Sequence, residues 1–115
     1  MAKARKKNAQ ASADAEAVRG YLNSVIMERG LSLNTREAYE RDLLNYVGFL
    51  RGSGKDVLSA GPPEVSAFLL HLKRDCGLSA RSSARCLVAI RGFYKNLLRK
   101  GLIERSPCDI VDMPA

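Results

Sequence analysis

The chain has 115 residues, of which 46% are hydrophobic and 27% charged, and its net charge is +7. This length suits one domain with one core, and no apolar run reaches the roughly 20 residues that a membrane-spanning helix needs. The positive excess favours a polyanion, most often nucleic acid, as the partner. Nothing in the sequence supports a membrane role.

Residues 1–12, MAKARKKNAQAS, are polar, alanine-rich and basic. We expect a disordered tail here, because the segment has too few apolar groups to offset the entropy lost on ordering. Its cations, Lys3, Arg5, Lys6 and Lys7, either serve solubility alone or contact phosphates without sequence preference. Both interpretations stay open.

Two helices are predicted in the first half of the chain. The first runs from about Ala13 to Arg29 and stops at Gly30, with apolar residues at helical spacing at Val18, Leu22, Val25 and Ile26. The second runs from about Thr35 to Arg51, capped by Ser32 or Asn34. Its apolar stripe is Tyr39, Leu43, Tyr46, Val47 and Leu50.

Two more helices are predicted in the second half. Gly61-Pro62-Pro63-Glu64 opens the third, which ends before Gly77 and turns inward Val65, Phe68, Leu69 and Leu72. The fourth covers residues 80–100, with Ser79 as N-cap and Gly101-Leu102 as a Schellman stop. No segment alternates with period two, so the predicted class is all-α. Residues 106–115 are predicted to be a docked segment or the start of a linker.

The fourth predicted helix is unusual, because residues 79–101 carry six basic residues and no acid. At about 100° per residue, its cations share a stripe opposite the apolar face; they are Arg81, Arg85, Lys95 and Arg99. The apolar face holds Cys86, Leu87, Ile90, Phe93, Tyr94 and Leu97. A solvated face more often pairs Glu with Lys one turn apart, so the stripe favours phosphate binding.

Two small residues lie inside the basic stripe. Gly92 would let another backbone come close, and Val88, which has no core to enter, can meet a thymine methyl. Arg81 and Arg85, near the helix start, can also fork two hydrogen bonds onto guanine in the major groove.

The start of the second helix offers secondary candidates. Thr35, Arg36 and Arg41 stand where side chains and backbone N–H groups can donate to a phosphate. Thr35 also fits plain capping, and Arg36 can instead pair with Glu40. Arg41 projects away from the apolar stripe, which makes it the best candidate of the three.

The residues indicate no catalytic, metal-binding or cofactor-binding constellation. The tyrosines lie on or beside apolar faces and are interpreted as packing residues; they are Tyr21, Tyr39, Tyr46 and Tyr94. The one histidine, His71, is interpreted as structural. The cysteines, Cys76, Cys86 and Cys108, match no metal pattern and indicate reduced thiols in a cytoplasmic protein.

The order of these elements resembles the N-terminal core-binding domain of tyrosine recombinases, the phage-integrase and Xer-type family. The likeness covers residues 13–115. The matching pieces are Ser32-x-x-Thr35-x-x-x-Tyr39-x-x-Asp42-Leu43, Leu78-Ser79, Ala89-Ile90-Arg91-Gly92-Phe93-Tyr94 and Gly101-Leu102-Ile103-x-x-Ser106-Pro107. The resemblance implies a SAM-like, four-helix orthogonal bundle of two crossed helical hairpins.

The resemblance also implies that the second and fourth helices lie against the major groove of a recombination site. Contacts would come from Arg81, Ser82 and Arg85, and from Thr35 and Arg36. Arg91 belongs to the family's motif, but helical geometry puts it at the flank of the apolar face, so we expect it to brace the fold. The family's tyrosine nucleophile belongs to a C-terminal domain, so these residues are expected not to cut DNA. The expected organisation is a basic tail (1–12), a DNA-binding domain (13–105) and the start of a linker to an absent catalytic domain (106–115).

Three functions follow as hypotheses. The first is a module that clamps double-stranded DNA for a tyrosine recombinase, monomeric alone and joined by further recombinase subunits in a complex. The second is a free-standing helical DNA-binding protein. The third is a protein-interaction module that docks a partner in a groove at Val88 and Gly92.

Overall fold

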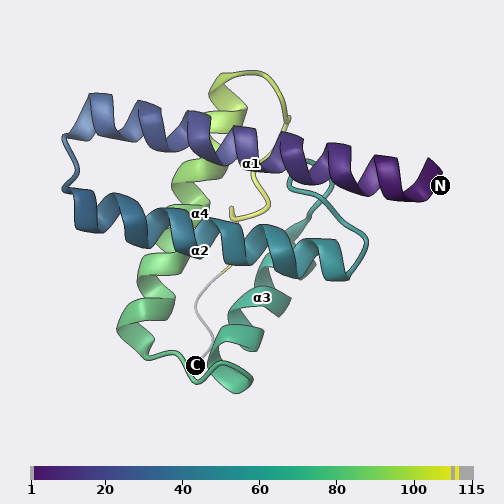
Figure 1. Ribbon diagram of the computed structural model, residues 1–115. Helices are drawn as coiled ribbons and strands as arrows, with labels where there is room; N and C mark the ends of the chain where they lie inside the picture. The colour runs from purple at the N-terminus through teal and green to yellow at the C-terminus, as the bar shows by residue number, and fades with distance from the viewer. Residues whose placement is uncertain (1, 110, 112–115) are drawn as a thin grey trace. The chain divides into compact units, whose positions relative to one another are not determined.

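The computed structural model describes residues 2–109 and 111, with the side chains of 13–25, 27–109 and 111. It contains four helices, α1 (Ala2–Arg29), α2 (Leu33–Gly52), α3 (Pro62–Arg74) and α4 (Ala80–Arg99). No strand occurs over these described ranges, which confirms the all-α prediction. The chain divides into two compact units, residues 1–57 and 58–115, each containing one helical pair (Figure 1). None of the helices described is long and apolar enough to span a lipid bilayer.

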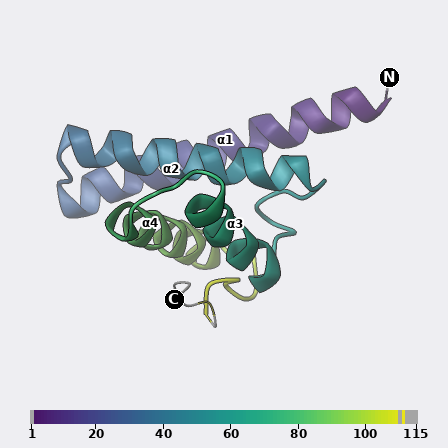
Figure 2. The same cartoon turned by 90° about the horizontal axis from the view of Figure 1, so that it is seen from below.

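The first unit is the pair α1 and α2, which run antiparallel and side by side in both views (Figures 1 and 2). Gly30, with φ of 60°, ends α1 where the sequence predicted. The buried apolar residues follow the predicted stripes; they are Val18, Tyr21, Leu22, Val25, Leu43, Tyr46, Val47 and Leu50. Tyr39 is only half-buried.

Helix α1 begins at Ala2, well before the predicted start near Ala13. Residues 2–12 are therefore helical, where the sequence predicted a disordered tail. The reason is intrinsic propensity: the segment is rich in Ala, Lys and Gln and contains neither Gly nor Pro. The prediction considered only its lack of apolar groups. The side chains of residues 1–12 lie outside the described ones.

The second unit contains α3 and α4, joined at one end by a short loop (Figure 1). Gly61 caps α3, and its N–H donates to Oε1 of Glu64 at 3.3 Å. The predicted inward residues of α3 are all buried; they are Val65, Phe68, Leu69 and Leu72.

Both ends of α4 match the prediction. The Ser79 hydroxyl accepts the N–H of Ser82 at 3.2 Å. At the other end, the N–H groups of Gly101 and Leu102 donate to the carbonyls of Leu98 and Leu97, each at 3.0 Å. Gly101 has φ of 73°, so this is the Schellman motif.

The segment after α4 packs beside that helix within the second unit. Ser106, Pro107, Cys108 and Val111 are buried. Arg91 of α4 holds the segment, because its Nη2 donates to the carbonyl of Val111 at 2.7 Å. This bond confirms the bracing role expected of Arg91, and the burial of 106–108 agrees with a docked segment. The start of a linker stays a prediction. Residues 110 and 112–115 of the predicted linker lie outside the described residues.

Candidate nucleic-acid interface

Helix α4 exposes a basic face because its apolar side chains occupy the opposite one. The six predicted apolar positions are all buried, and Ser83, Ala89 and Asn96 are buried with them. On the exposed face stand Arg81, Lys95 and Arg99. The helix contains no acidic residue to neutralise them. The predicted basic stripe therefore exists as a solvent-facing surface.

Ala84 and Val88 form the middle of this face. Both are exposed, Val88 to 49%. Their short, uncharged side chains leave the helix backbone open to close approach between the flanking cations. Val88 was predicted from the sequence and Ala84 was not, although Ala84 lies one helical turn from both Arg81 and Val88.

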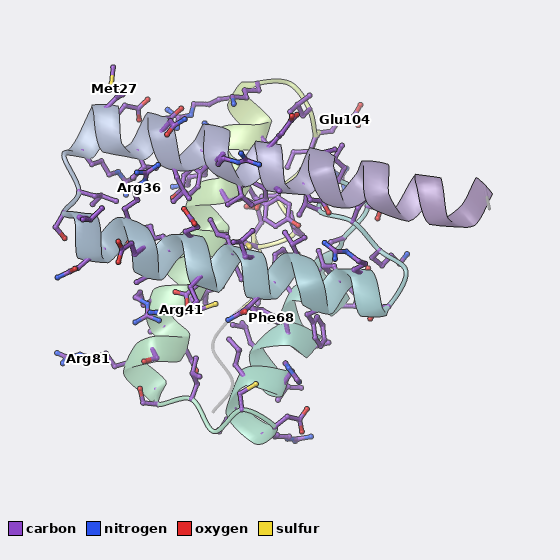
Figure 3. The ribbon with its side chains drawn as sticks, in the orientation of Figure 1. Met27, Arg36, Arg41, Phe68, Arg81 and Glu104 are labelled. Atoms are coloured by element: carbon purple, nitrogen blue, oxygen red, sulfur yellow. The ribbon has the colours of Figure 1, made fainter. Side chains whose placement is uncertain are left out.

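Arg81 is the most available cation of α4. It lies on the first turn, and its side chain extends away from the helix (Figure 3). It has no hydrogen-bond or ion-pair partner among the described residues. Arg85 and Arg99 differ, since each interacts with another group of the chain, and Arg85 is half-buried. Ser82 is half-buried too, with its N–H used in the Ser79 cap.

Lys95 lies at the border of the basic face. It lines a shallow cavity with residues of α4 and of the docked segment, namely Arg91, Leu98, Ser106, Cys108 and Asp109. The Asp109 carboxylate therefore stands beside this end of the stripe, and the acid-free character belongs to the helix rather than to its surroundings. Inside the cavity, burial raises the pKa of the Cys108 thiol to about 11, opposed in part by Arg91.

At the start of α2, the hydroxyl residues serve the helix cap. Ser32, not Asn34, is the N-cap. Its Oγ accepts the N–H of Thr35 at 3.2 Å and donates to Oγ1 of Thr35 at 3.0 Å. The capping interpretation of Thr35 is thus the one that its hydrogen bonds support.

The two arginines of α2 point to different sides. Arg36 lies between α1 and α2 in Figure 3, and its Nη2 donates to Oδ1 of Asn23 at 3.4 Å. Its Nε is buried without a partner. Arg41 is exposed on the side of α2 away from α1 and has no partner among the described residues (Figure 3). Arg41 is therefore the available cation of α2, whereas Arg36 reaches to α1 rather than making the expected pair with Glu40.

The remaining reactive side chains bear on catalysis and metal binding. Tyr21, Tyr46 and Tyr94 are buried, which confirms that they are packing residues. Within the described part of the chain, no group of three or more His, Cys, Asp or Glu side chains could hold a metal ion. His71 lies between Asp75 and Cys76, an arrangement that was not predicted from the sequence.

Comparison with known proteins identifies the family of this chain. Residues 18–101 match the family described as phage integrase, N-terminal SAM-like domain. The chain is 42% identical over 96 residues to the tyrosine recombinase XerD of Pseudomonas aeruginosa, covering 82% of this chain and 31% of that protein. It is 39% identical over 97 residues to XerD of Rhizobium meliloti, covering 84% and 31%. It is 36% identical over 104 residues to XerD of Agrobacterium fabrum, covering 90% and 31%.

The chain thus spans about 31% of the length of these relatives. No solved structure gives a significant match. The family match takes in α2, α3 and α4 completely and the C-terminal part of α1. On this match, the chain belongs to the phage integrase N-terminal SAM-like domain family.

Proposed function

We propose that residues 13–105 form the DNA-binding module of a tyrosine recombinase, which holds duplex DNA at the recombination site through major-groove contacts. The observation that carries this proposal is the exposed, acid-free basic face of α4, which lies opposite its buried apolar face. Solubility alone does not require such a face, whereas binding to a phosphate backbone is strengthened by it. The relatives that this chain resembles are tyrosine recombinases, which supports the same conclusion.

The exposed residues of α4 have distinct roles in this proposal. Arg81, at the helix start, contacts a phosphate or a guanine edge, while Lys95 and Arg99 contact phosphates farther along the helix. Val88 meets a thymine methyl, and Ala84 allows the close approach. Ser82 and Arg85 supply supporting contacts.

The start of α2 supplies a second set of contacts. Arg41 is the principal residue of this set, because it is exposed and has no partner among the described residues. Thr35 and Arg36 contribute only if their bonds to Ser32 and Asn23 are exchanged for bonds to DNA.

The catalytic part of the recombination reaction lies, in this proposal, outside the described residues. A nucleophilic tyrosine must reach the scissile phosphate, and three of the four tyrosines, Tyr21, Tyr46 and Tyr94, are buried. The module binds and positions DNA, and further recombinase subunits join it on the same site. Incubation of the 115-residue chain with nicked duplex DNA should therefore give no covalent protein–DNA adduct on a denaturing gel.

Fluorescence anisotropy of a labelled duplex of about 30 base pairs, titrated across a salt series, tests the binding surface. The affinity should fall steeply with salt, and each phosphate contact removed should lower the slope of log K against log salt by about one. We expect Arg81→Ala to weaken binding several-fold and to flatten the slope. Lys55→Ala is the matched control, because it removes one exposed charge outside α2 and α4.

Three other outcomes would change the assignment. Equal losses for Arg81→Ala and Lys55→Ala would mean that α4 is not the contact surface. Binding that persists when Arg81 and Arg85 are both replaced by alanine would move the surface to α1 or α2. No binding at low salt would contradict DNA binding by this chain and favour the protein-interaction module at Val88 and Gly92.

A further inference from the structure

The C-terminal end of α3 carries a row of three side chains that DNA binding does not use. Nδ1 of His71 lies 2.8 Å from Oδ2 of Asp75, and Nε2 of the same ring lies 3.5 Å from Sγ of Cys76. Cys76 is exposed, and the side chain of Asp75 is 69% exposed. Small solutes can therefore reach the row.

The backbone holds these three residues together. His71 and Asp75 are one helical turn apart, and the N–H of Asp75 donates to the carbonyl of His71 at 2.9 Å. The N–H of Cys76 donates to the same carbonyl at 3.2 Å, so the chain folds back at the helix end and brings the thiol to the ring. The buried Phe68 ring lies beside the imidazole, with centroids 6.4 Å apart. The geometry is local and set by the last turn of α3.

The Asp75 carboxylate determines which nitrogen of His71 is a donor. A carboxylate only accepts hydrogen bonds, so the N–H at Nδ1 donates a hydrogen bond to Asp75. In this tautomer of the ring, Nε2 presents a lone pair. The thiol of Cys76 lies within hydrogen-bonding distance of that lone pair. This is the order of groups, nucleophile, base and orienting acid, that activates a thiol.

We propose that Cys76 is a thiol–disulfide exchange site for anionic low-molecular-weight disulfides, with His71 as its base and Asp75 as a positioning residue. Nε2 takes the thiol proton, and the thiolate attacks one sulfur of the disulfide. A new S–S bond forms as the old one breaks, and the departing thiolate takes the proton from the imidazolium. One thiol and one disulfide give one mixed disulfide and one thiol, so atoms and electrons balance without a further oxidant.

Two features of the surroundings support this choice of thiol and substrate. The last turn of α3 also carries Lys73 and Arg74, whose positive charges suit an anionic disulfide such as oxidised glutathione. The other two thiols are inaccessible, with Cys86 exposed to 1% and Cys108 to 4%. Modification should therefore stop at one site.

The test is reaction of the folded 115-residue chain with oxidised glutathione, followed by intact-mass and peptide mass spectrometry. A chromogenic aryl disulfide gives the rate. We expect one glutathione per chain, located on Cys76, and no adduct in Cys76→Ser. In Cys86→Ser/Cys108→Ser, where Cys76 is the one remaining thiol, the folded chain should react faster than the same chain in urea, where His71 no longer faces the thiol.

Variants of the base and the positioning residue separate activation from simple exposure. His71→Gln should slow exchange roughly tenfold, below the 10²–10⁴ range usual for general bases, because the site is open to water. Asp75→Asn should slow it by a smaller factor. Added imidazole should restore part of the rate of His71→Gln and leave the rate of the wild type unchanged, a difference that loss of packing would not produce.

Two results would overturn the proposal. One is an equal rate for the wild type and His71→Gln, with circular dichroism showing both folded. The other is a Cys76 thiol that reacts no faster in folded Cys86→Ser/Cys108→Ser than in the same variant in urea, a comparison that decides the matter even if His71→Gln does not fold. Neither measurement involves DNA, so failure of this proposal and failure of DNA binding are distinguishable.

Discussion

The two helices proposed to contact DNA begin alike but use their first arginines differently. Ser32 before α2 and Ser79 before α4 adopt the same extended conformation, with ψ of 156° and 158°. Each hydroxyl accepts an N–H three residues on at 3.2 Å. Yet Arg36 bonds to Asn23 of α1, whereas Arg81 is exposed without a partner among the described residues. What packs against a helix start therefore decides whether its arginine braces the fold or remains available.

The two helices also differ in the sign of their charges. The sequence of α2 mixes signs, with Glu37, Glu40 and Asp42 among its arginines, while α4 has no acid. Like-signed charge on one face costs stability unless a partner of opposite charge compensates it. The comparison supports the proposal that α4 contacts a polyanion, whereas the charged residues of α2 serve mainly its own unit.

The largest expected effect tests whether the two units depend equally on their buried aromatic side chains. Tyr46 of α2 and Tyr94 of α4 both have 0% exposure. Replacing either by alanine should lower the free energy of unfolding by about 3–5 kcal/mol, measured by urea denaturation, because a large cavity remains. The Phe variants are the controls and should cost about 1 kcal/mol. A loss well below this at only one position would show that the two units are not equally packed.

A pH series sharpens the comparison, because the first unit holds a buried acid with a raised pKa. Burial raises the pKa of Asp14 from 3.8 to about 6, opposed by the Val57 N–H and raised further by Asp56. The folded state then binds a proton more tightly than the unfolded state. The contribution of Asp14 to stability is therefore fully present below about pH 4 and lost as pH rises through about 6.

Asp14→Asn isolates this effect, because asparagine does not titrate. Its stability relative to the wild type should rise between about pH 4 and 7, by at most about 3 kcal/mol. Urea unfolding at several pH values measures the difference. A difference independent of pH would contradict the raised pKa, and Asp109→Asn, an exposed acid of the second unit, is the control.

The two serine N-caps should contribute equally to the free energy of unfolding. Ser32→Ala and Ser79→Ala each remove one side-chain acceptor at a helix start and should cost about 1 kcal/mol. Thermal unfolding followed by circular dichroism measures both, with Ser66→Ala, an exposed position inside α3, as the control. A larger loss for Ser32→Ala would indicate that its second bond, to the Thr35 hydroxyl, adds stability.

The smallest expected effect is the most direct test of the comparison. Arg36→Ala removes the bond to Asn23 and should lower stability by about 0.5 kcal/mol, since that bond is long and exposed. Arg81→Ala should leave stability unchanged while weakening DNA binding. Urea unfolding and anisotropy on the same two variants measure this crossover. If both variants changed stability and DNA affinity equally, the distinction between a structural Arg36 and a DNA-contacting Arg81 would be wrong.

Much of the fold was predictable because its signals are local. Ser79, Gly101 and the apolar spacing of α4 predicted that helix within one residue of its observed end. The start of α1 was missed, since a helix rich in Ala, Lys and Gln needs no apolar stripe to form. Of the candidate contacts, the exposure of Arg81 and Arg41 was predictable from helical geometry. The half-burial of Arg85 and the reach of Arg36 to α1 were not.

The sequence by itself determined the helices, their caps and the basic stripe, because propensity, capping and periodicity act between residues a few positions apart. Only the tertiary structure decided which arginines are engaged. Asn23 is 13 residues from Arg36, and Val111 is 20 residues from Arg91. Contacts at such separations depend on how helices and loops pack, and no periodic pattern encodes them.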